Sequence, residues 1–150
     1  MIELSKIVCP TDFSPTSSRA VDYAAAMADS FGAELVLLHV IPEMTYPLRS
    51  FGMASSFPHL KEELHNRAMD AMQERTKEIH DKLPNVQVHL VLRDGDAHDV
   101  ILDCAKDQKA DMIVMGTHGH TGLKHALLGS TAEKVVRMSE VPVLTVRTHD

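Results

Sequence analysis

Cysteine, long apolar runs and basic residues are scarce in this chain, and each shortage excludes a class of protein. The two cysteines, Cys9 and Cys104, form no Cys-x-x-Cys pair and fall in apolar patterns, so we expect core residues rather than redox or metal sites. No apolar run approaches the ~20 residues that span a bilayer. The first residues lack the segments of a signal peptide, so we expect a cytoplasmic location. The net charge of -6 opposes general binding to nucleic acid.

The common signatures of nucleotide-binding and hydrolytic proteins are missing as well. The chain contains no Gly-x-Gly-x-x-Gly and no P-loop closed by Lys-Ser or Lys-Thr. No Gly-x-Ser-x-Gly elbow frames a serine, and no nucleophile–base pair can be read from the spacing. We therefore predict no catalytic residue.

What the chain does contain is a regular alternation of strand and helix patterns over its 150 residues, a length that suits a single domain, 1–150. Apolar runs predict strands, and apolar residues at helical spacing predict helices between them. The expected strands are 7–9, 34–41, 86–92, 110–116 and 142–147, and the expected helices are 15–31, 59–83, 96–105 and 130–139. Parallel strands need helical crossovers, so the prediction is an α/β protein with an open, Rossmann-like, five-stranded parallel sheet and helices on both faces.

Open sheets of this kind bind ligands beyond the carboxyl ends of their strands. Three of those ends carry candidate binding residues. These residues are Pro10, Thr11 and Asp12 after the first strand, Val40 near the end of the second, and Met115 and Gly116 at the end of the fourth.

The fourth strand runs into a glycine-rich loop that leads to a helix start. The loop holds Gly116, His118 and Gly119, and Gly129, Ser130 and Thr131 follow it. Glycine lets a backbone approach a phosphate closely, and the N–H groups of a helix start point at the anion. Two plainer interpretations remain open: the glycines only turn the chain, or Ser130 and Glu133 form a capping box.

Asp12 and the loop histidines also have two interpretations each. Asp12 can accept hydrogen bonds from a ribose diol or can cap the first helix, although Ser14 and Pro15 already suit that capping role. His118, His120 and His125 lack the partners of a known zinc spacing, so we predict polar loop residues and no metal ligand of the protein. Lys124 either pairs with phosphate or is solvated.

Three segments and one glycine motif together resemble the universal stress protein family. Residues 6–14 (KIVCPTDFS) resemble the opening strand of its domains, 111–119 (DMIVMGTHG) the fourth strand and loop, and 142–146 (PVLTV) the closing strand. The spacing Gly116-x2-Gly119-x9-Gly129-Ser130 matches the glycine motif of the ATP-binding branch. The resemblance runs from about residue 4 to 147.

The resemblance implies a strand order of 3-2-1-4-5 and a homodimer paired through the last strand, at about 142–147. It implies ATP or another adenine nucleotide as the ligand, with Mg²⁺ on the phosphates. Asp12 would contact ribose, the backbone near Val40 would contact adenine, and Gly116, Gly119, Gly129, Ser130 and Thr131 would surround ribose and phosphates. The implied function is an ATP-binding stress-response regulator with at most weak hydrolysis.

Two other functions remain open. Residues 43–57 carry methionines and phenylalanines in a connection without a clear period, which suits a protein-interaction module that needs no nucleotide. A slow ATP hydrolase is the other possibility, with His118 or His120 as the candidate base. The sequence does not identify a protein partner.

Overall fold

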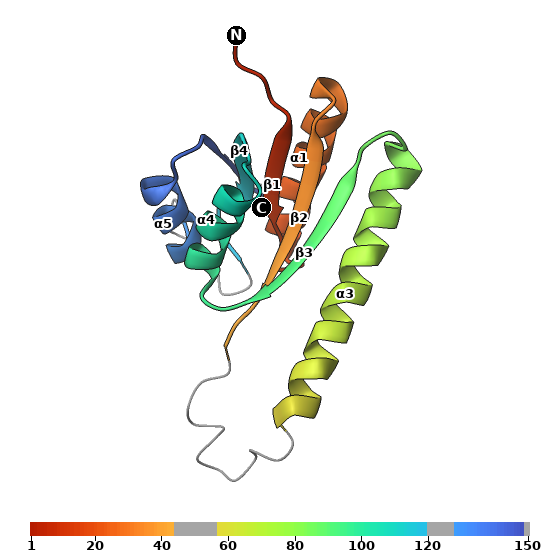
Figure 1. Cartoon of the computed structure of the whole chain (residues 1–150), viewed down its shortest axis with the longest axis vertical. Coiled ribbons are helices and arrows are strands. Elements are labelled where there is room, and N and C mark those ends of the chain that lie inside the picture. Colours follow the sequence, from red (N-terminus) through yellow and green to blue (C-terminus); the bar gives the residue numbers. More distant parts are fainter. Residues whose placement is uncertain (44–56, 120–127, 149–150) are drawn as a thin grey trace.

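Five parallel strands form the centre of the molecule in the computed structural model, which describes residues 1–43, 57–119 and 128–148. The strands are β1 (Lys6–Pro10), β2 (Glu34–Ile41), β3 (Val88–Asp94), β4 (Met112–Gly116) and β5 (Val143–Val146). They pair in the order β3-β2-β1-β4-β5, as predicted (Figure 1). The near-continuous apolar run of β2 fits this place, because Leu35 to Leu38 are buried on both faces of the sheet.

Helices cover both faces of the sheet, which confirms the predicted fold class. They are α1 (Pro15–Phe31), α3 (Phe57–Lys82), α4 (Ala97–Asp107) and α5 (Ser130–Met138). One core cluster joins the sheet to α1 and α3 through Ala24 and Met72, and a second joins it to α4 and α5 through Ile101 and Val135. None of the described helices is long and apolar enough to cross a membrane.

The ends of α1 follow the signals in the sequence. Ser14 is the N-cap, and its hydroxyl accepts a hydrogen bond from the backbone N–H of Ser17 at 3.2 Å. Pro15 occupies the first turn, where its missing N–H costs nothing. Gly32 ends the helix in the left-handed conformation, with φ of 66°.

Several predicted boundaries were wrong by a few residues. The third strand begins at Val88 and extends to Asp94, because Val86 packs in the core without joining the ladder with β2. The fourth strand begins at Met112, since the N–H of Ala110 still bonds to Ala105 at the end of α4. The long helix already begins at Phe57.

Three residues placed on apolar helix stripes are exposed instead. Phe31 is 63% exposed at the end of α1, Leu60 is 40% exposed in the first turn of α3, and Val136 is 44% exposed in α5. Two of these, Phe31 and Leu60, lie in the end turns of their helices. Periodicity describes the middle of a helix better than its end turns, where the neighbouring layer can stop before the pattern does.

Candidate functional site

A cavity of about 380 Å³ opens at the carboxyl edge of the sheet, where β1 and β4 lie side by side. The strand order reverses between these two strands, since β2 and β3 follow on one side and β5 on the other. The structure brings every predicted binding residue to this cavity: Pro10, Thr11, Asp12, Val40, Met115, Gly116, His118, Gly119, Gly129, Ser130 and Thr131.

Further lining residues were not predicted from the sequence. Ala97 and Ile101 come from α4 and Ser17 from α1, and Thr117 directly follows β4. The signal for the two α4 residues was available, because a helix that begins beyond a strand end starts at the same edge of the sheet. No local pattern marks Ser17, which reaches the cavity only because α1 packs against β4.

The start of α1 holds the Asp12 carboxylate. Its Oδ1 accepts hydrogen bonds from the backbone N–H of Ser14 at 3.0 Å and from the Ser17 hydroxyl at 2.8 Å. Asp12 thus supports the first turn of α1, and it also lines the cavity, where its contact with ribose stays a prediction. Ser14, and not Asp12, is the N-cap.

The loop that carries Asp12 is also fixed from β2. His39 Nδ1 lies 2.7 Å from the backbone oxygen of Thr11, and the His39 ring packs against Phe13 with ring centroids 4.6 Å apart. Phe13 has a φ of 63°, a left-handed conformation that a bulky residue rarely adopts. These contacts hold the strained turn between β1 and α1 in one shape.

The glycines of the motif lie close to other parts of the chain. A Cβ on Gly116 would come within 2.9 Å of the Thr16 side chain, and one on Gly119 would overlap Asp12 Oδ2. A Cβ on Gly129 would lie 3.1 Å from the Thr117 backbone oxygen. None of these three has a positive φ, so they are not required by backbone conformation. They let β4 and its loop approach α1 and α5.

The helix start at α5 differs from the predicted capping box. Gly129 is the N-cap, and no side chain makes the cap hydrogen bond. The first intrahelical bond runs from Glu133 N to Gly129 O at 2.9 Å. The N–H groups of Ser130 and Thr131 consequently have no acceptor within the helix, and both residues line the cavity. This geometry suits an anion.

The charges around the cavity are few. Among the described lining residues, Asp12 and His118 are the only ionisable groups, and none of these residues is a lysine or an arginine. His118 Nδ1 lies 3.1 Å from the hydroxyl of the buried Thr117. His120, His125 and Lys124 lie outside the described residues, as does most of the connection 43–57.

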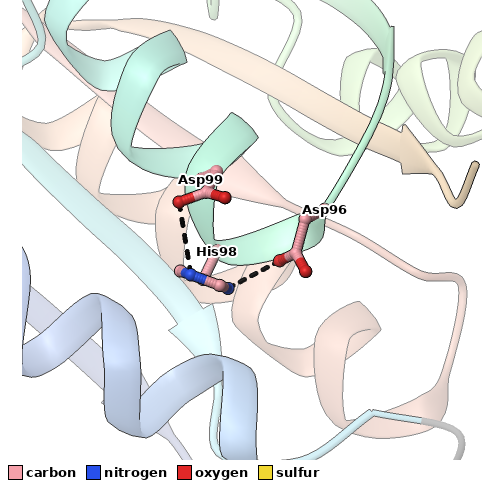
Figure 2. Close-up of side chains that lie close together, drawn as sticks. All are labelled: Asp96, His98 and Asp99. Carbon is pink, nitrogen blue, oxygen red and sulfur yellow. Dashed lines mark ion pairs between the residues drawn. The ribbon is translucent and has the colours of Figure 1, made fainter.

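One group of possible metal ligands lies at the start of α4, formed by Asp96, His98 and Asp99, whose ligand atoms lie within 4.8 Å of one another. Figure 2 shows His98 between the two carboxylates, with Nδ1 2.6 Å from Asp96 and Nε2 3.2 Å from Asp99. Each ring nitrogen thus already faces a carboxylate, and the positive end of a helix opposes a cation. Asp96 is the N-cap of α4, and its side chain makes no cap hydrogen bond.

Known proteins match the chain in sequence and in structure. The family model described as "Universal stress protein family" matches residues 3–147. Universal stress protein MJ0577 of Methanocaldococcus jannaschii is 34% identical, over 95% of this chain and 94% of its own. Universal stress protein YxiE of Bacillus subtilis is 32% identical, over 95% of this chain and 99% of its own.

Solved structures agree with this match. The structure of MJ0577 superposes with a TM-score of 0.85 at 35% identity, covering 99% of each chain. A universal stress protein solved in complex with cAMP has a TM-score of 0.66 at 26% identity, covering 99% of this chain and 100% of its own. With the family model matching almost its whole length, the chain belongs to the universal stress protein family.

Proposed function

We propose that this chain binds an adenine nucleotide, with ATP as the expected ligand, and acts as a stress-response regulatory module. The observation that carries the proposal is the meeting of all the predicted residues around one cavity at the reversal of strand order. The related structure in complex with cAMP supports an adenine nucleotide as the ligand class.

Each part of the nucleotide has a matching part of the cavity in this proposal. Val40 contacts adenine from β2, and Asp12 accepts hydrogen bonds from ribose hydroxyls. The phosphates lie between the loop at Gly116 and Gly119 and the start of α5, where backbone N–H groups and the Ser130 and Thr131 hydroxyls can donate. Mg²⁺ would accompany the phosphates and neutralise part of their charge, and we expect no metal ligand from the protein.

Calorimetry with ATP, ADP and AMP tests the proposal. Wild-type protein should bind with micromolar affinity. The affinity of Asp12→Asn should be lower by a factor of roughly ten or more, because a charge-assisted hydrogen bond becomes a neutral one. Asp29→Asn, an exposed substitution on α1, is the matched control and should bind like wild type. Absence of heat with all three nucleotides at millimolar concentration would contradict the proposal.

We further propose that the chain acts as a cytoplasmic homodimer paired through β5. The described cysteines are both free thiols, which suits a reducing compartment. β5 is an edge strand of the sheet and consists of apolar and β-branched residues that invite pairing with a second copy.

A further inference from the structure

The Ser17 hydroxyl is a buried junction of hydrogen bonds beside the cavity. Ser17 is 5% exposed, and its Oγ donates to Asp12 Oδ1 at 2.8 Å. The same Oγ accepts from the Ser14 hydroxyl at 3.2 Å and from the Asp12 backbone N–H at 3.3 Å. The Thr11 hydroxyl lies 3.1 Å away. One hydroxyl carries a single hydrogen. The Ser14 backbone oxygen, at 3.1 Å, is another possible acceptor, but the contact to the Asp12 carboxylate is shorter and charge-assisted, so it is the bond that Ser17 donates.

The consequence is that one oxygen of the Asp12 carboxylate is fixed from behind. Oδ1 receives the Ser17 hydroxyl and the Ser14 backbone N–H at 3.0 Å. Two donors on one oxygen restrict rotation of the carboxylate about its terminal bond. The other oxygen, Oδ2, is thereby directed at Gly119, on the side of the glycine loop.

We propose that Ser17 is a positioning residue that orients the Asp12 carboxylate toward the sugar of a bound nucleotide. The inference rests on the proposed function, since it assigns the sugar to Asp12. It predicts that the Ser17 hydroxyl contributes to recognition of ribose hydroxyls without contacting adenine or phosphate.

Ser17→Ala isolates this role well. The helix cap uses the backbone N–H of Ser17, which donates to the Ser14 hydroxyl and survives the substitution. Alanine also has the highest helix propensity, so α1 should remain intact. Ser18→Ala, one position further along the same helix, is the matched control because its side chain lies outside this network.

The experiment measures affinity for ATP and for 2′,3′-dideoxy-ATP by calorimetry in wild type, Ser17→Ala and Ser18→Ala. Wild type should bind ATP more tightly than the dideoxy nucleotide. In Ser17→Ala the ratio of the two affinities should fall roughly three- to tenfold, because a poorly oriented carboxylate forms weaker hydrogen bonds with the ribose hydroxyls. Affinity for the dideoxy nucleotide should stay unchanged. A purely structural role would weaken both nucleotides equally and leave the preference as in wild type.

The remaining outcomes separate this inference from the proposed function. If wild type binds neither nucleotide, the proposed function fails. If wild type prefers ATP and Ser17→Ala keeps the full preference, the proposed function stands and the positioning role is overturned. If wild type binds both nucleotides equally, Asp12 does not recognise ribose, and the positioning role is overturned with it. Equal loss of preference in Ser18→Ala would also overturn it, because the effect would not belong to the Ser17 hydroxyl.

Discussion

Single residues at the cavity are constrained mainly by contacts within the chain. Gly129 has φ of -69° and ψ of 166°, a conformation that any residue adopts. Its N–H nevertheless bonds to the Thr117 oxygen at 2.6 Å, and an added Cβ would lie 3.1 Å from that same oxygen. The absence of a side chain therefore lets α5 begin directly against the end of β4.

We predict that Gly129→Ala weakens nucleotide binding roughly tenfold and that Gly129→Val weakens it further. The added carbon atoms push Thr117 and His118 away from α5 and distort the proposed phosphate site. Calorimetry with ATP measures the effect, and thermal unfolding shows whether the fold is retained. Wild-type affinity in a folded Gly129→Val protein would show that the phosphates lie elsewhere.

The surroundings of the two cysteines also set the reactivity of their thiols. Burial raises the pKa of the Cys9 thiol to about 12, and it also raises the pKa of Cys104. The thiolate is the reactive form, so native protein at pH 8 should resist alkylation while unfolded protein reacts at both sites. Mass spectrometry after iodoacetamide treatment, with and without denaturant, measures this. Rapid modification of Cys9 in native protein would contradict the burial of β1.

At the scale of elements, α3 is tied to the sheet near the carboxyl end of β3. Figure 1 shows α3 running alongside β3. Asp94, the last residue of β3, faces Lys61 Nζ at 3.1 Å and His65 Nε2 at 2.7 Å, both from α3. Burial by itself would raise the pKa of Asp94, but hydrogen bonds from Lys61 and His65 outweigh it and lower that pKa below its ordinary value.

This shift predicts how the free energy of unfolding changes with pH. Because the folded pKa of Asp94 lies below the unfolded value of about 3.9, the stabilisation is complete above that pH and is lost as pH falls through the folded pKa. Asp94→Asn should therefore cost about 1 kcal/mol at pH 7 and progressively less as the pH falls below about 3.9.

Urea unfolding of both proteins at pH 7 and at about pH 3 measures the difference. Asp81→Asn, an exposed substitution on α3, is the control and should not change stability at either pH. An equal cost of Asp94→Asn at both values would mean that the ion pairs do not stabilise the contact between α3 and β3.

At the scale of the whole molecule, the sheet ends in two edge strands, β3 and β5. Within the sheet, Ile113 and Thr117 donate their N–H groups to the oxygens of Pro142 and Val146. Backbone groups alternate along a parallel ladder, so Thr145 directs its N–H toward the open edge. This edge is where we propose that the second copy pairs.

We predict that Thr145→Pro weakens or abolishes the dimer. Proline removes the N–H that points to the open edge, and it leaves the hydrogen bonds between β5 and β4 in place. Native mass spectrometry and sedimentation measure the oligomer. Thr145→Ser, which keeps the N–H, is the matched control and should remain dimeric. A wild-type monomer, or a fully dimeric Thr145→Pro, would remove β5 from the proposed interface.

The sequence by itself determined the fold class, the succession of elements and the edge of the sheet at which the cavity lies. Buried parallel strands and amphipathic helices leave period-specific patterns in the chain, and strand ends collect at one edge whatever the details of packing. The candidate residues from Pro10 to Thr131 could be named for that reason. The resemblance to a family added the strand order.

Only the tertiary structure decided how those residues meet. Three features join segments that lie apart in the sequence: the close approach of Gly119 to Asp12, the packing of Gly116 against Thr16, and the presence of Ser17 beside the end of β4. The replacement of Ser130 by Gly129 as the N-cap follows from the bond to Thr117. Local patterns report the conformation of one segment, whereas such contacts depend on how two layers pack, and packing is settled by the whole core.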